Sequence, residues 1–478
     1  MRVLITDPVA QAGLDILTDR GLEIVDLAGE PVEKVLAVIG SVHGWIIRSD
    51  TSVDAELLNQ ADHLQVVGRA GTGIDNVDLD VATLRGVLVM NTPDGNTISA
   101  AEHTIALLLA LSRNVHLGYK SLVEGRWDRK ALQGVELNGK VLGIVGLGRI
   151  GRRVMAIARA LGMQILGHDP YAPQDLGDSD ELEMVSLEDL LRRSDFVSLH
   201  VPRTDETRNL LNAGNLKLMK PTARLINAAR GGIVNEADLA AALNSGVIAG
   251  AAVDVFTTEP PPEDHPLRQA KNILVTPHLG AYTKEAQEGA SVAICRQVAD
   301  FLLDGKMENA LNLPVSDLSL LKSLEPHLDL AADMGRILCQ LVDGPIGQVT
   351  VTCYGTLEDS HPVALAALRG LLEGVLDTRL NYVSTAAVAK ERGIGLTHGC
   401  DYADMGYANL MRVTVVTTGG ETTMAGSVFG RRHKRVVEID GNHLELNPEG
   451  VMLFIRNRDV PGVLGRVGTT LGDFGINI

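Results

Sequence analysis

The sequence predicts an α/β protein in which two parallel-sheet domains are followed by an α+β region. From the N-terminus to about residue 310, short apolar, β-branched runs alternate with helical segments, an order typical of parallel sheets with crossover helices. Beyond residue 315, helical stretches precede runs of alternating polar and apolar residues, joined by Gly419–Gly420 and Gly441–Asn442. Such runs favour antiparallel hairpins. The 478 residues, 45% of them hydrophobic, are enough for several cores.

The first predicted domain begins at the N-terminus. We expect its strands at 3–6, 22–25, 44–47, 64–67 and 88–90, with helices such as 10–18 and 55–59 between them. Residues 99 to about 123, which contain IALLLAL, then predict one long helix that connects two domains and offers a face to a dimer.

The second predicted domain is organised around residues 140–170. A buried strand at 141–145 leads into Gly146, Gly148 and Gly151; a helix follows at 152–161 and a second strand at 164–167. This G-x-G-x-x-G turn between strand and helix is typical of a Rossmann-like, dinucleotide-binding unit. The glycines allow a tight turn and a close approach of the pyrophosphate, and the helix N-terminus offers N–H groups to it. A glycine-rich turn that serves packing alone is the alternative.

The acidic residue that follows the second strand predicts the choice of cofactor. Asp169 would accept hydrogen bonds from the ribose hydroxyls and repel a 2′-phosphate. No arginine follows closely, since the next residues are Pro170, Tyr171 and Ala172. We therefore expect NAD rather than NADP.

The remaining strands of this domain are expected at 196–200, 223–226, 248–253 and 273–276, followed by a helix at 284–303. We expect one parallel domain to be inserted in the other. In this interpretation the cofactor domain spans 93–282, and the first domain is formed by 1–92 together with 283–310.

Polar residues follow three successive strands of the cofactor domain: Arg230 in INAARGG, Asp254 and Glu259 in DVFTTEPP, and His278 in TPHLG. Because ligands bind at the carboxyl ends of parallel strands, one crevice could collect them. A histidine can take the hydroxyl proton of a 2-hydroxy acid as hydride leaves its carbon. A carboxylate can orient that histidine, and an arginine can clamp the substrate carboxylate. Asp254 could bind the nicotinamide amide.

Each of these residues also has a simpler interpretation. His278 could cap a loop, Arg230 could be a solvated turn residue, and Glu259 could be an acid at a helix start. Asp254 could be an ordinary turn acid. Their joint position after successive strands favours the catalytic interpretation.

Composition restricts the possible partners. The formal net charge of −17 argues against nucleic acid or an anionic membrane as a partner. The four cysteines lie far apart without metal-ligand spacing, which predicts neither a metal site nor a disulfide framework. The N-terminus enters a strand directly, and the apolar run at 105–111 is too short to cross a bilayer. We expect a cytoplasmic, soluble protein.

These segments, together with VGLGRIG and VVGRAGTGIDNVD, resemble the D-isomer-specific 2-hydroxyacid dehydrogenase family over essentially the whole chain. The resemblance implies Arg230, Glu259 and His278 as a catalytic triad. It also implies a set of cofactor-binding residues: Thr72, Gly146, Gly148, Arg149, Ile150, Gly151, Asp169, Val201, Ala228, Ala229, Arg230, Asp254, His278, Leu279, Gly280 and Ala281.

Two arginines of the first domain favour a phosphorylated substrate. Arg48 in WIIRSDT and Arg69 in VVGRAGTG each follow a predicted strand, and a phosphate needs cationic partners beyond the carboxylate clamp. Both could also be surface arginines. With Thr72, Arg230 and His278 they resemble the substrate site of members that oxidise 3-phospho-D-glycerate to 3-phosphooxypyruvate, the first step of the phosphorylated L-serine pathway. Tyr282, in HLGAYT, departs from the family's usual HLGAST and puts the substrate affinity in question.

The C-terminal half resembles the long form of these enzymes. Residues 315–448 resemble its intervening regulatory domain, where RRHKR (Arg431, Arg432, Lys434, Arg435) could bind an anion, although a solvated hairpin edge is favoured. Residues 450–478 resemble the start of an ACT domain, incomplete here, with a strand expected at 451–456 and a helix at 463–474. That likeness implies Asp459 and Asn477 as serine-effector residues, and it implies a homo-oligomer, a dimer or tetramer.

Two other functions stay open. A glyoxylate or hydroxypyruvate reductase would keep the fold and change the acid, but Arg48, Arg69 and the C-terminal extension count against it. An NAD-sensing regulator would bind the cofactor without turnover, so a measurement of turnover distinguishes such a regulator from an enzyme.

Overall fold

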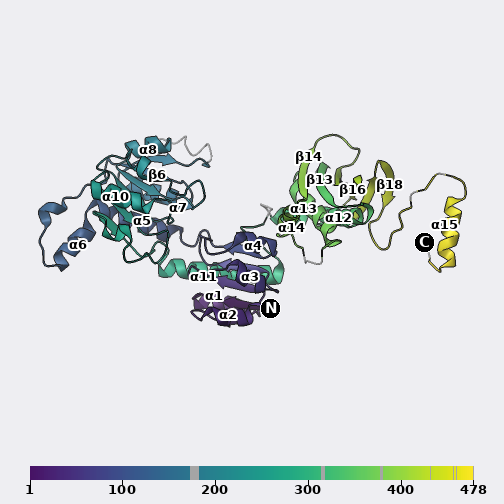
Figure 1. Cartoon of the computed structure of the whole chain (residues 1–478), viewed down its shortest axis with the longest axis horizontal. Coiled ribbons are helices and arrows are strands. Elements are labelled where there is room, and N and C mark those ends of the chain that lie inside the picture. Colours follow the sequence, from purple (N-terminus) through teal and green to yellow (C-terminus); the bar gives the residue numbers. More distant parts are fainter. Residues whose placement is uncertain are drawn as a thin grey trace. The chain divides into compact units, whose positions relative to one another are not determined.

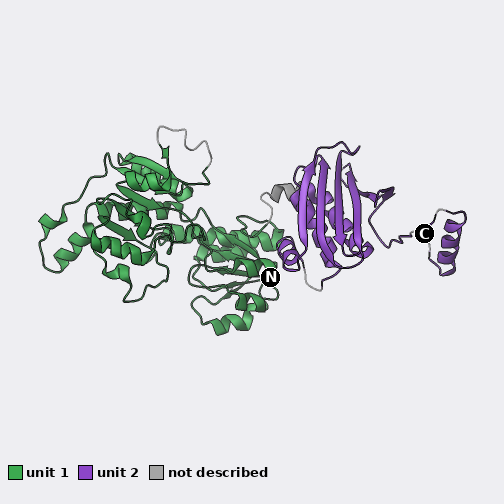
Figure 2. Ribbon diagram, turned by 45° about the horizontal axis from the view of Figure 1, so that its top comes forward, with its two compact units in different colours: residues 1–313 green, residues 314–478 purple. Residues whose placement is uncertain are grey.

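The computed structural model of the chain describes residues 1–172, 182–313, 318–376, 380–430, 432–455, 457–458 and 460–476, without the side chains of 318–323. The chain divides into two compact units, Met1–Leu313 and Pro314–Ile478 (Figure 2).

The N-terminal sheet of the first unit has five parallel strands in the order β2-β1-β3-β4-β5. They are β1 (Arg2–Ile5), β2 (Glu23–Asp26), β3 (Gly44–Ile47), β4 (Val66–Arg69) and β5 (Leu88–Asn91), connected by α1 (Gln11–Asp19), α2 (Val32–Ile39), α3 (Ala55–Gln60) and α4 (Leu79–Leu84). The strand expected at 64–67 begins two residues later, so Arg69 is its last residue.

A helix distant in sequence completes this domain. α11 (Lys284–Asp304) follows the second sheet and packs on α1, β3 and β4 (Figure 1). Gly44 and Gly68 give it room, since a Cβ atom on Gly68 would lie 2.6 Å from a Val298 methyl carbon and 2.8 Å from a carbon of Ile294. The helix buries Ile294, Cys295 and Val298 completely, and this burial ties it to the first sheet.

The second sheet has seven parallel strands in the order β12-β11-β10-β9-β6-β7-β8. Its strands are β6 (Val141–Val145), β7 (Gln164–His168), β8 (Glu183–Met184), β9 (Phe196–Leu199), β10 (Arg224–Asn227), β11 (Gly250–Val253) and β12 (Ile273–Val275). Its helices are α7 (Arg149–Ala160), α8 (Leu187–Arg193), α9 (Ala213–Leu216), α10 (Glu236–Ser245) and the 3-10 turn η3 (Pro266–Gln269). The order reverses between β6 and β9, the point at which such sheets bind ligands.

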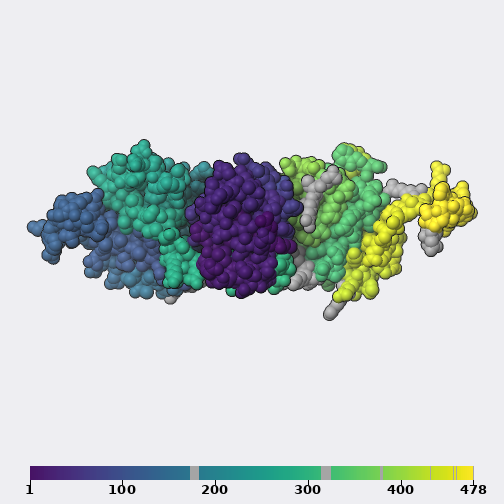
Figure 3. Space-filling model, turned by 90° about the horizontal axis from the view of Figure 1, so that it is seen from below, coloured from purple at the N-terminus to yellow at the C-terminus, as the bar shows by residue number. Residues whose placement is uncertain are grey.

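The prediction of a single long helix from 99 to about 123 is wrong. Two helices occur instead, α5 (Thr97–Ser112) and α6 (Val115–Val123), because Asn114 adopts a left-handed conformation with φ 53°. α5 buries Ile105, Leu108 and Leu111 and packs against α7 and the second sheet. α6 and the 3-10 turn η1 (Arg129–Leu132) instead project away from it (blue in Figures 1 and 3).

The second unit contains a six-stranded mixed sheet in the order β14-β13-β15-β16-β17-β18. Its strands are β13 (Ile346–Gly355), β14 (Gly395–Asp401), β15 (Asn409–Thr417), β16 (Gly420–Phe429), β17 (His433–Ile439) and β18 (Asn442–Leu446). The expected hairpins from β15 to β18 are antiparallel, whereas β14 pairs parallel with β13. Neither β13 nor β14 was expected.

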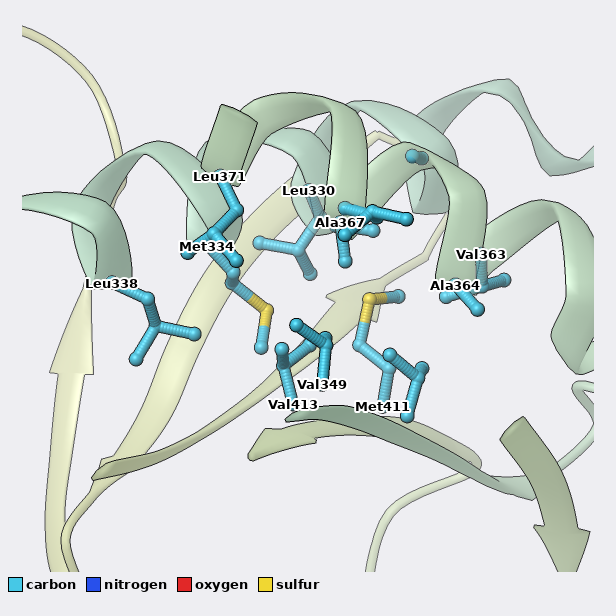
Figure 4. Close-up of a cluster of buried hydrophobic side chains, with 14 of the residues drawn as sticks. Leu330, Met334, Leu338, Val349, Val363, Ala364, Ala367, Leu371, Met411 and Val413 are labelled. Carbon is cyan, nitrogen blue, oxygen red and sulfur yellow. The ribbon is translucent and has the colours of Figure 1, made fainter. Parts of the chain in front are cut away.

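Helices cover one face of this sheet. α12 (Leu318–Leu341), which was not expected, and α13 (Ser360–Glu373) direct apolar side chains toward Val349, Met411 and Val413 of the strands (Figure 4), and α14 (Thr385–Glu391) leads into β14. These side chains form one continuous buried core.

The last segment forms a helix, α15 (Val463–Asp473), close to the expected range. The strand expected at 451–456 is absent from the described residues of that stretch. Asp459 and Asn477 lie outside the described residues. Among the helices that the structure describes, none is long and apolar enough to cross a membrane.

Candidate active site

The glycine turn between β6 and α7 fits a dinucleotide. Gly146 has φ 93°, and a Cβ atom there would lie 2.6 Å from the His200 carbonyl oxygen; a Cβ on Gly151 would lie 2.1 Å from the Gly146 oxygen. Both positions therefore need glycine for packing. Gly148 differs, since nothing lies within 4 Å of its Cβ position at the start of α7. The space before the helix N-terminus can accept a pyrophosphate group.

Asp169, directly after β7, lies beside this turn. Its Oδ2 accepts a hydrogen bond from the Leu147 N–H at 2.8 Å, and its Oδ1 accepts one from the Tyr171 N–H at 2.9 Å. These bonds hold the carboxylate at the adjoining strand end, where a ribose would be bound. Nearby, Arg149 pairs with Asp94 at 2.7 Å, and the Val201 side chain contacts the turn at Gly146.

A cleft of about 450 Å³ collects most of the residues expected to carry the chemistry. Arg69, Arg230, Glu259, His278 and Ala281 line it. Arg48 and Thr72 are not among its lining residues, and the Thr72 hydroxyl donates to Asn96 Oδ1 at 2.7 Å. The lining residues not expected from the sequence are Ser49, Ser52, Gly73, Asp75, Asn76, Asn96, Arg203, Gly231, Val255, Phe256 and Thr257.

His278 and Glu259 form a direct pair. Nδ1 of His278 lies 2.7 Å from Oε2 of Glu259, whose Oε1 accepts a bond from the Phe256 N–H at 2.9 Å. Burial alone would raise the pKa of Glu259, but the hydrogen bonds from His278 and from the Phe256 N–H outweigh it, so that pKa lies below its ordinary value. His278 has φ 51°, a conformation that non-glycine residues rarely adopt and that often marks functional sites.

Arg230 is held at two of its nitrogen atoms. Nε donates to Asp75 at 3.0 Å and Nη1 donates to the Ala229 carbonyl at 2.7 Å. Nη2 lies beside Gly73, where a Cβ atom would be only 2.2 Å away. The described residues give Nη2 no acceptor, so this end of the guanidinium is available to an anion in the cleft.

Asp254 is completely buried and bound by protein donors. Its carboxylate accepts from the Leu279 N–H at 2.8 Å and the Gly280 N–H at 2.9 Å, and it also contacts Thr276 and His103. Burial would raise its pKa, but these hydrogen bonds lower it below the ordinary value. Asp254 thus fixes the loop that carries His278.

Arg69 and Arg48 provide positive charge in the first domain. Burial, together with the nearby charges of Arg230 and Arg48, lowers the pKa of Arg69 to about 10. Nε of Arg48 and Nε of Arg69 are buried without a hydrogen-bond partner in the described part of the chain. Unpaired buried cationic donors favour an anionic ligand.

Tyr282, which departs from the family pattern, is 72% exposed and does not line the cleft.

A further pair supports the loop of Glu259. Glu236, the first residue of α10, accepts from the Thr257 N–H at 2.6 Å and contacts His265 Nε2 at 2.9 Å. No motif indicated these residues.

Asp75 and Asn76 could have been predicted as site residues from the sequence, because they are polar residues shortly after the strand that ends in Arg69.

Two of the three described candidates in the RRHKR segment are ion-paired, and the third, Arg432, is exposed. Lys434 pairs with Asp333 at 2.6 Å and Arg435 with Glu445 at 3.4 Å, while Arg431 lies outside the described residues.

None of the four cysteines forms a disulfide, and no group of three or more potential metal ligands occurs in the described ranges.

The glycine turn, Asp169 and the His–Glu–Arg cleft define the class of a nicotinamide-dependent dehydrogenase. Two family models match: the NAD-binding domain of D-isomer specific 2-hydroxyacid dehydrogenases over residues 105–280, and the D-3-phosphoglycerate dehydrogenase intervening domain over 323–440.

Relatives match over the whole chain. D-3-phosphoglycerate dehydrogenases of Synechocystis and Archaeoglobus fulgidus are each 39% identical over 100% of this chain, and over 86% and 91% of their own lengths. Among solved structures, a Thermus thermophilus protein has a TM-score of 0.60 and 36% identity, covering 65% of this chain and 100% of its own. The NAD complex of a Staphylococcus aureus formate dehydrogenase has a TM-score of 0.60 and 30% identity, covering 66% and 100%.

The chain therefore belongs to the D-isomer specific 2-hydroxyacid dehydrogenase family, in its D-3-phosphoglycerate dehydrogenase branch. It carries the family's NAD-binding domain and is an NAD-dependent oxidoreductase of a small-molecule substrate.

Proposed function

We propose that this protein oxidises 3-phospho-D-glycerate to 3-phosphooxypyruvate with NAD and thereby opens the phosphorylated route to L-serine. The observation that carries this proposal is the cleft, which holds the His278–Glu259 pair and two arginines, Arg230 and Arg69. Two arginines suit a substrate with two anionic groups.

The chain's residues divide the reaction between them. Glu259 binds Nδ1 of His278, which leaves Nε2 of His278 as the atom that takes the proton of the C2 hydroxyl. Glu259 stabilises the imidazolium that results, because its low pKa keeps it ionised. Arg230 binds the carboxylate of the substrate and polarises its C2 oxygen. Bound NAD supplies a nicotinamide ring as the hydride acceptor.

The phosphate is assigned to the arginines of the first domain. Arg69 lines the cleft, and Arg48 is close enough for its charge to lower the pKa of Arg69. In this proposal residues 1–92 and 283–310 bind the substrate, and residues 93–282 bind NAD. The cofactor-binding residues in this proposal are Thr72, Gly146, Gly148, Arg149, Ile150, Gly151, Asp169, Val201, Ala228, Ala229, Arg230, Asp254, His278, Leu279, Gly280 and Ala281.

The exposed apolar side chains of the α6 segment support a homo-oligomer. Val115, Tyr119, Leu122, Val123 and Trp127 are all more than half exposed, at 57, 72, 61, 68 and 79%. Clustered apolar surface of this kind favours association. We place a dimer contact there and keep a tetramer, an L-serine effector site and a cytoplasmic location as parts of the proposal.

Parallel assays of NADH formation with 3-phospho-D-glycerate, D-glycerate and D-lactate test the substrate, with the oxidised product trapped. Preference for the phosphorylated acid supports the proposal. Preference for an unphosphorylated acid would favour a glyoxylate or hydroxypyruvate reductase. Cofactor binding without turnover would favour an NAD-sensing regulator.

A further inference from the structure

Two adjacent residues in the cleft wall contact both arginine-bearing segments of the site. Asp75 and Asn76 lie between β4 and α4 and line the cleft. Asp75 accepts from Arg230 Nε at 3.0 Å. The Asn76 amide nitrogen donates to the carbonyl oxygens of Arg48 at 2.7 Å and Thr51 at 2.5 Å.

We propose that Asp75 and Asn76 are positioning residues, Asp75 for the carboxylate clamp Arg230 and Asn76 for the loop that carries Arg48. This inference rests on the proposed function, because it assigns the two arginines to different anionic groups of one substrate.

Asp75 determines which side of the Arg230 guanidinium is presented to the cleft. With Nε bound to Asp75 and one Nη1 hydrogen bound to the Ala229 carbonyl, the remaining hydrogens, mainly those of Nη2, are left for a carboxylate. Asp75 also supplies negative charge to a group of three arginines. Arg230 and Arg48 lower the pKa of Arg69, whereas Asp75 acts in the opposite direction. Without Asp75, repulsion would displace the clamp from its position.

Asn76 acts on the loop together with Asp7. The N–H groups of Arg48 and Thr51 both donate to the carboxylate of Asp7, which is 2% exposed, and the carbonyls of the same two residues both accept from Asn76. All four backbone groups are thus bound by two side chains. Ser49 and Ser52 of this loop line the cleft. A loop fixed on both sides holds Arg48 in one position, which lowers the entropic cost of binding a phosphate.

Kinetics with two substrates test these roles separately, since both acids carry the carboxylate but only one carries the phosphate. Asp75→Ala should raise KM for 3-phospho-D-glycerate and for D-glycerate by a similar factor of about ten, and Asp75→Asn by less, because the amide oxygen can still accept from Nε. Asn76→Leu keeps the approximate size of the side chain and adds no charge, but it loses both donated hydrogen bonds. It should raise KM about tenfold for 3-phospho-D-glycerate and less than about twofold for D-glycerate. NAD affinity, followed by fluorescence, should stay unchanged in all variants.

Asp78→Ala is the matched control. Asp78 caps α4 by accepting from the Val81 N–H at 3.0 Å, and it contacts neither arginine. The Asp78→Ala substitution should lower Tm and leave the KM values for both acids unchanged. Equal KM effects of Asn76→Leu on the two acids, or unchanged KM in Asp75→Ala, would overturn the inference.

Failure of the proposed function can be recognised separately in the unmodified protein. If it oxidises only an unphosphorylated acid, the proposed substrate is wrong. Asp75→Ala must then still raise KM for that acid about tenfold, and an unchanged value would overturn the positioning role of Asp75 as well.

Discussion

At the scale of single residues, the backbone of His278 restricts how its role can be tested. Its φ of 51° disfavours alanine but is tolerated by asparagine. We expect His278→Asn to lower kcat by about 10²–10⁴-fold, because no base remains to take the hydroxyl proton. The NAD dissociation constant should change little, and circular dichroism should show an intact fold. Near-normal turnover would remove His278 from the mechanism.

Asp169 is expected to determine the choice of cofactor. Asp169→Ala removes the acceptor of ribose hydroxyl bonds and the repulsion of a 2′-phosphate. It should weaken NAD binding about tenfold and reduce discrimination against NADP. Titration of both nucleotides by fluorescence measures the two effects. An unchanged preference between NAD and NADP would contradict the ribose role.

Asp254 should make stability depend on pH in the acidic range. Its pKa is lowered in the folded state, so it contributes stability above the unfolded value of about 4, and this contribution is lost as pH falls through the folded value. Asp254→Asn should therefore be less stable than the unmodified protein at neutral pH. The difference in Tm between the two should narrow below about pH 4. A constant difference would show that its charge is not involved.

At the scale of elements, two glycines of one turn should respond differently to the same substitution. Gly151→Ala places a Cβ atom 2.1 Å from the Gly146 oxygen and should lower the unfolding free energy by about 1–3 kcal/mol. Gly148→Ala meets no protein atom within 4 Å. It should keep the Tm and weaken NAD binding instead. Equal Tm losses in both variants would contradict the assignment of the open space to the pyrophosphate.

Elements with a strong local pattern could be predicted from the sequence, and elements that depend on distant contacts could not. The strand β6 has the expected bounds because a buried apolar run leads directly into a glycine turn. The break at Asn114 was missed because asparagine is compatible with a helix and only its left-handed backbone ends one. The parallel pairing of β14 with β13 was missed because partner choice leaves no mark on either strand.

The site shows the same limit. His278, Glu259 and Arg230 could be proposed because each follows a strand of a recognisable unit. That Asp75 contacts Arg230 across the cleft depends on how two domains pack, and no spacing along the chain encodes it. Arg48 is not among the lining residues, but the loop that carries it lines the cleft through Ser49 and Ser52, which no motif indicated.

At the scale of the whole molecule, the first sheet depends on α11. The helix buries Ile294 and Val298 against β3 and β4, beside Gly44 and Gly68. A fragment of residues 1–92 should therefore stay largely unfolded by circular dichroism, because it leaves this apolar face uncovered. A fragment of residues 1–313, which corresponds to the first compact unit, should unfold cooperatively. A cooperative transition in the shorter fragment would show that α11 is dispensable.

The late position of α11 also affects synthesis on the ribosome. The five strands of the first sheet emerge before the inserted domain, but the helix that covers their face follows the entire insertion. At ordinary elongation rates, the gap between Asn91 and Lys284 amounts to roughly 10–40 s. During this interval the inserted domain can complete its own sheet, while the nascent N-terminal strands expose apolar surface. The first segment to be translated is thus among the last to be stabilised, which makes it a natural client of ribosome-associated chaperones.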